Sequence, residues 1–134
     1  MSGLEVAIMG AVASQVSKTA LEWLQSQGSE ISEEEWKQVG YQIGIEIQSI
    51  DRQSQRNPEE LKTLERELTN AAKVYQKLEI FGEDFDFDSD VVSLYSNLAD
   101  ICGEWAVDMK FNTSMEEHRS NFEELHKEYK ETVM

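Results

Sequence analysis

The chain has 134 residues, of which 12 are lysine or arginine and 27 are aspartate or glutamate, giving a formal net charge of −15. Its hydrophobic content of 40% argues against a wholly disordered chain, and its single cysteine excludes a scaffold held by internal disulfides. The negative charge is also the wrong sign for gripping phosphates, so we expect no direct binding of nucleic acid.

The length predicts one domain spanning residues 1–134. The longest apolar run, Val6 to Ala13, is too short to span a membrane, and the residues before it lack the positive charge of a secretion signal. We therefore expect a cytoplasmic protein and do not expect it to act on a membrane.

The first expected helix covers residues 3–26. Ser2 and Glu5 have the spacing of a capping box, and Gly28 suits the end of the helix. Its apolar stripe consists of Leu4, Ile8, Val12, Val16, Ala20 and Leu24. Because this helix is apolar and rich in small residues, we expect residues 1–27 either to pack at the periphery of the bundle or to form a contact between copies of the chain.

A second capping box, Ser32 with Glu35, starts the next helix. Residues 39–47 are ambiguous, since their apolar side chains fit helical spacing and also alternate as in a strand. The capping box and the length of the segment favour a helix, in which Gly40 and Gly44 would allow close packing.

Three further helix starts follow. Asn57 before Pro58 begins the third helix, Asp88 or Ser89 the fourth, and Ser114 with Glu117 the fifth. The polar stretch 51–57 is expected to be a loop. The sequence therefore predicts an all-α fold, a single antiparallel helical bundle of four to five helices.

The negative charge is concentrated in residues 79–109, which hold nine acidic residues and no basic one. Asp100, Glu104 and Asp108 are four residues apart and would share one helix face. Aromatic side chains flanked by charge, such as Phe85 and Phe87, are typical of protein interfaces, although both could equally pack into the end of the bundle. The predicted partner-binding residues are Glu83, Asp84, Phe85, Asp86, Phe87, Asp88, Asp90, Asp100, Glu104 and Asp108. A merely solvated acidic surface is the alternative.

The sequence contains no strong metal-binding or catalytic motif. A calcium loop starting at Asp84 would need glycine sixth and glutamate twelfth, where Ser89 and Tyr95 stand. A bundle dimetal site needs two Glu-x-x-His motifs, and the sequence has one, Glu123 to His126. Cys102 lies on an apolar stripe and is expected to be a buried structural thiol. We therefore predict no catalytic residue, no metal and no cofactor, and we expect His118 at the core edge and His126 exposed.

These observations favour a small acidic, non-catalytic interaction module that docks a basic surface of another protein through residues 79–109. It could be an adaptor, an immunity-type inhibitor or a subunit of a complex. One alternative is a nucleic-acid mimic that inhibits a DNA- or RNA-binding enzyme with carboxylates in place of phosphates. Another is a membrane-acting bundle that uses the N-terminal apolar helix, which the charge of −15 disfavours.

Overall fold

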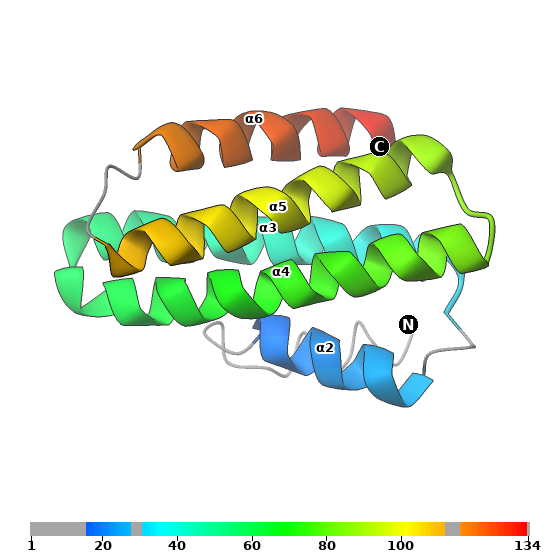
Figure 1. Cartoon of the computed structure of the whole chain (residues 1–134), viewed down its shortest axis with the longest axis horizontal. Coiled ribbons are helices and arrows are strands. Elements are labelled where there is room, and N and C mark those ends of the chain that lie inside the picture. The colour runs from blue at the N-terminus through cyan, green and yellow to red at the C-terminus, as the bar shows by residue number, and fades with distance from the viewer. Residues whose placement is uncertain (1–15, 28–30, 112–115, 134) are drawn as a thin grey trace.

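The computed structural model describes residues 16–27, 31–111 and 116–133 (Figure 1). In these ranges the chain forms helices and no strand, so the all-α prediction is confirmed. The elements are α2 (Val16–Gln27), α3 (Glu33–Arg56), the short 3-10 turn η2 (Pro58–Glu60), α4 (Leu61–Asp84), α5 (Ser89–Lys110) and α6 (Glu116–Val133).

Helices α3 to α6 run back and forth as an antiparallel bundle (Figure 1). Helix α6 covers one face of this bundle, where it packs against α5 and α3, and α2 lies on the opposite face against α4 and α3. Of the first expected helix, residues 16–26 lie in α2, while residues 3–15 lie outside the described residues. The described part of that helix is therefore a cover on one face of the bundle.

The local signals at the helix starts are confirmed wherever the structure describes them. The Ser32 hydroxyl accepts a hydrogen bond from the Glu35 amide at 3.1 Å, and the Glu35 carboxylate accepts one from the Ser32 amide at 3.4 Å. Asn57 caps the turn that leads into α4, and the Asp88 carboxylate caps α5 by accepting from the Asp90 amide at 2.9 Å. Ser114 lies outside the described residues.

Residues 39–47 lie within α3, so the helical interpretation is confirmed. A Cβ atom placed at Gly40 would lie 2.2 Å from a ring carbon of Tyr95, and one at Gly44 would lie 2.0 Å from the His126 ring. The two glycines therefore make room for rings from α5 and α6, which lets those helices approach α3 closely.

The expectation of a loop at 51–57 was wrong. Helix α3 continues to Arg56, because Asp51 and Ser54 on its last turns are buried rather than solvated. The Asp51 carboxylate accepts two hydrogen bonds from the Arg119 guanidinium of α6, at 2.7 and 3.0 Å. This ion pair supplies the polar partners that a buried carboxylate needs and fixes the start of α6 on α3.

Three buried tyrosines join the bundle to a single stretch of α3. Tyr75 of α4 donates to the Gly40 carbonyl, Tyr95 of α5 to the Trp36 carbonyl, and Tyr129 of α6 to the Lys37 carbonyl. Each phenol buries a large ring while its hydroxyl keeps a hydrogen bond. The core is thus centred on the first half of α3.

Candidate functional site

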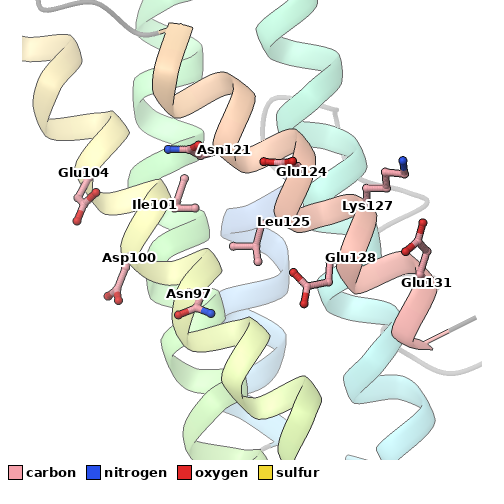
Figure 2. A pocket seen from close by; sticks show the side chains of 10 residues that line it. All are labelled: Asn97, Asp100, Ile101, Glu104, Asn121, Glu124, Leu125, Lys127, Glu128 and Glu131. Carbon is pink, nitrogen blue, oxygen red and sulfur yellow. The ribbon is translucent and has the colours of Figure 1, made fainter.

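A groove with a volume of about 600 Å³ runs between α5 and α6. Its lining residues are Asn97, Asp100, Ile101 and Glu104 from α5, and Asn121, Glu124, Leu125, Lys127, Glu128 and Glu131 from α6. Figure 2 shows Ile101 and Leu125 pointing toward one another between the two helices. These two half-buried side chains give the groove an apolar floor between polar edges.

Helical periodicity places the aspartate and glutamate side chains of the groove on the outside of the bundle. On α5, Leu98, Cys102 and Trp105 are buried, which turns Asp100 and Glu104 outward. On α6 the buried side chains are Phe122, His126 and Tyr129, and the glutamates that line the groove occupy the neighbouring positions on its α5 side. The groove therefore lies where the edge of the buried face of α5 meets the edge of the buried face of α6.

The groove is strongly acidic. Asp100, Glu104, Glu124, Glu128 and Glu131 line it, with Lys127 as its one basic residue. All five carboxylates are exposed, and within the described ranges none of them forms an ion pair or a side-chain hydrogen bond. Unpaired carboxylates on two adjacent helices create a local negative potential that attracts a cationic group.

The predicted partner-binding residues fall into separate parts of the structure. Asp100 and Glu104 line the groove. Asp108, one turn further along α5, is half-buried and hydrogen-bonded to His118 of α6. The predicted residues between 83 and 90 lie at one end of the bundle, where they span the end of α4, the connection at 85–88 and the start of α5 (Figure 1). We call this segment the turn at residues 83–90.

In that turn the four aspartates at 84, 86, 88 and 90 are exposed. Asp86 has a φ of 56°, in the left-handed region, and the Phe87 amide donates to the Gly82 carbonyl at 2.9 Å. This is the Schellman arrangement that ends many helices, usually with glycine at the left-handed position. The geometry places the aspartates on a rigid turn between two helices.

The two phenylalanines of the turn have different environments. The Phe87 ring packs against Trp36 with a centroid distance of 5.1 Å and is half-buried. Phe85 stacks on Phe81 and Phe87 and is 38% exposed. Phe87 thus belongs to the end of the bundle, while Phe85 keeps part of its ring at the surface.

The sequence reasoning did not find the α6 half of the groove. Glu124, Glu128 and Glu131 are spaced four and three residues apart, which places them on one face of α6, but residues 110–134 have a nearly balanced charge. The net charge of this segment therefore does not reveal the three glutamates. Face-by-face counting would have shown the acidic stripe, although not that it faces α5.

The expectation that His126 is exposed was wrong, since it is 5% exposed. Its ring occupies the space above Gly44, stacks on Tyr41 and hydrogen-bonds the Tyr41 carbonyl at 3.4 Å. Burial lowers the pKa of His126, and Lys130 lowers it further, while the hydrogen bond to the carbonyl acts in the opposite direction. His118 lies at the core edge, half-buried, as expected.

A second groove, of about 430 Å³, lies on the other side of α6, between α6 and α3. Its charged lining residues are Arg52, Glu123, Lys127 and Lys130, so bases outnumber acids there. The two sides of α6 therefore carry opposite local charge, acidic toward α5 and basic toward α3.

Cys102 is buried, and desolvation raises the pKa of its thiol, as expected of a structural cysteine. Across residues 16–27, 31–111 and 116–133, no group of three histidine, cysteine, aspartate or glutamate side chains is arranged to hold a metal ion. No helix in the part of the chain that the structure describes is long and apolar enough to cross a membrane.

Comparison of the chain with models of protein families, with curated proteins and with solved structures finds no match.

Proposed function

We propose that the protein is a non-catalytic interaction module that binds a basic segment of another protein in the α5/α6 groove. The observation that carries this proposal is the groove itself, in which five exposed, unpaired carboxylates flank the apolar pair Ile101 and Leu125. Charge on the edges and apolar surface on the floor match an amphipathic helix with lysine or arginine beside its apolar stripe.

The groove supplies what such a helix needs. Its apolar floor lies along the seam between α5 and α6, where a third helix can bury its apolar stripe. The carboxylates on both edges would steer a basic partner toward the seam and fix its orientation, while the apolar contacts slow its release. An adaptor, an inhibitor and a subunit of a complex would all use this surface in the same way.

The acidic turn at residues 83–90 extends the negative surface beyond the groove. It lies at the α4–α5 end of the bundle, and Asp100 and Glu104 lie further along the same α5 helix. We propose that the turn contributes long-range attraction and that the groove contributes the contacts. The two surfaces then differ in how their loss affects binding, since lost steering slows association and lost contacts speed dissociation.

The proposal is tested with a synthetic amphipathic helix that carries lysines on both sides of a leucine stripe, with binding followed by fluorescence anisotropy. The groove variant combines Glu104→Gln, Glu124→Gln and Glu128→Gln. The matched control combines Glu22→Gln, Glu34→Gln and Glu59→Gln, which removes the same charge from exposed sites outside both the groove and the turn at residues 83–90. At about 0.2–1 kcal/mol for each exposed pair, we expect the groove variant to bind roughly 3-fold to 100-fold more weakly.

The control should bind within about threefold of the unaltered protein at the same salt concentration. Equal loss in the two variants would mean that net charge alone attracts the peptide and would contradict a binding site in the groove. For a natural partner that binds DNA or RNA, competition between this protein and a nucleic acid duplex would distinguish a nucleic-acid mimic from an ordinary adaptor, because a mimic occupies the same surface as the duplex.

A further inference from the structure

Glu67 of α4 is fully buried beneath α2, where a glutamate is rarely found without partners. One of its carboxylate oxygens, Oε2, accepts a hydrogen bond from the Ser17 backbone amide of α2 at 3.3 Å. The other oxygen, Oε1, is buried with no partner among the described residues, and so is the Ser17 hydroxyl. The contact between α2 and the bundle therefore contains polar atoms that are incompletely paired.

A second carboxyl group belongs to the same region. Glu46 of α3 has one buried carboxylate oxygen, Oε2, that finds no partner in the described ranges. The groups that act on Glu67 are Ser17 from α2, the Glu46 carboxyl from α3 and the Arg66 guanidinium from α4 itself. In this junction of three helices, Glu67 Oε1 and Glu46 Oε2 are buried acceptor oxygens to which no group of the described residues donates a hydrogen bond.

Protonation supplies the missing hydrogen. A neutral carboxyl is far cheaper to bury than a carboxylate, and it brings an O–H donor to a site that is rich in acceptors. Burial raises the pKa of Glu67, and the like charge of Glu46 raises it further, while Ser17 and Arg66 act in the opposite direction. Burial also raises the pKa of Glu46.

Helix α2 depends on this junction more than a larger helix would. Among its described side chains Ser17, Ala20 and Leu24 are buried, and Leu21 and Trp23 are partly buried against the core, so Ser17 is the polar group in an otherwise apolar contact. It also lies on the opposite face of the bundle from α6, so its loosening would leave the α5/α6 groove intact (Figure 1).

We propose that α2 is a proton-dependent cover of the α3/α4 face, docked when the Glu67 carboxyl holds a proton and loosened when the Glu46 and Glu67 carboxyls ionise. This inference concerns a different face from the acidic groove and does not depend on the proposed function. Its physiological meaning would be control, by pH, over access to the surface beneath α2.

The direction of the effect follows from proton linkage. A carboxyl that binds its proton more tightly when α2 is docked makes docking tighter at low pH, and the gain is lost as the pH rises through the raised pKa. One coupled proton changes the docking equilibrium by at most about tenfold for each pH unit.

Hydrogen exchange of the α2 backbone amides in the full chain, expressed as protection factors, measures docking directly. Between about pH 4.5 and about pH 7.5 we expect the protection of α2 to fall, by at least threefold and by no more than roughly a thousandfold. In Glu67→Gln, which is neutral at every pH and still offers an oxygen to the Ser17 amide, protection should stay high across this range. Glu83→Gln, at an exposed position of the same helix, is the control and should keep the full pH dependence.

Glu46→Gln provides a second test that does not alter the hydrogen bond to Ser17. Removing the like charge should raise α2 protection at about pH 7.5 and reduce its dependence on pH. The proposal is overturned if α2 of the unaltered protein is equally protected at both pH values, or if Glu67→Gln keeps the original dependence. Either result would mean that the proton on Glu67 does not control the docking of α2.

Discussion

Gly44 and Gly103 both lie inside helices, yet they have opposite surroundings. A Cβ at Gly44 would lie within 2.2 Å of two His126 ring atoms, whereas a Cβ at Gly103 meets nothing within 4 Å. We predict that Gly44→Ala destabilises the protein by about 1–3 kcal/mol, because the His126 ring must move. Gly103→Ala should stabilise it by roughly 0.5–1 kcal/mol through helix propensity. Urea unfolding measures both free energies, and equal effects at the two sites would contradict the packing described for Gly44.

His126 should give the attachment of α6 a pH dependence opposite to that of α2. Because burial lowers its pKa, the ring is neutral in the folded bundle, and this contribution is fully present above the ordinary pKa of histidine. It is lost as the pH falls below that value, so the protection factors of the α6 amides should be lower at about pH 5 than at about pH 7. An NMR titration in which the His126 ring titrates at or above the ordinary value would show that this assignment is wrong.

At the scale of elements, α6 is fixed to α3 mainly by polar contacts. Arg119→Gln would leave the Asp51 carboxylate, which is 3% exposed, without its cation. We predict a loss of about 3–5 kcal/mol in the free energy of unfolding, since breaking a buried ion pair strands a buried charge. The exposed pair between Lys110 and Glu65, at 3.8 Å, provides the comparison, and Lys110→Gln should cost less than about 1 kcal/mol. Similar losses in both variants would contradict the role given to Asp51.

The elements that the sequence predicts well are those set by local chemistry. The Ser32 and Asp88 caps involve residues two or three positions apart, so a short stretch of sequence contains the whole interaction. The burial of Asp51 and His126 could not be predicted in this way. Asp51 is buried because Arg119 comes from another helix, and His126 because Gly44 leaves space on another helix. The same reason explains why only the α5 half of the groove was predicted. The acidic stripe on α5 is contained in one short stretch of sequence, whereas its packing beside α6 is a contact between distant residues.

At the scale of the whole molecule, the net charge of −15 resolves into distinct surfaces. The α5/α6 groove and the turn at residues 83–90 are acidic, and the α3/α6 groove is lined mainly by basic residues. The turn exposes part of the Phe85 ring, whereas the groove has the apolar pair Ile101 and Leu125 between carboxylates on two helices. We propose that a basic partner contacts the protein in the groove and that the turn at residues 83–90 only attracts this partner electrostatically.

The most direct measurement is the mapping of backbone amide chemical shifts while the full chain is titrated with the synthetic basic amphipathic helix. The largest changes at saturation should fall on residues 97–104 of α5 and 121–131 of α6. Changes at residues 83–90 should be smaller and should disappear at about 0.5 M salt, where screening acts within a few ångströms. Changes that are largest at the turn, or that spread evenly over all acidic side chains, would contradict a binding site in the α5/α6 groove.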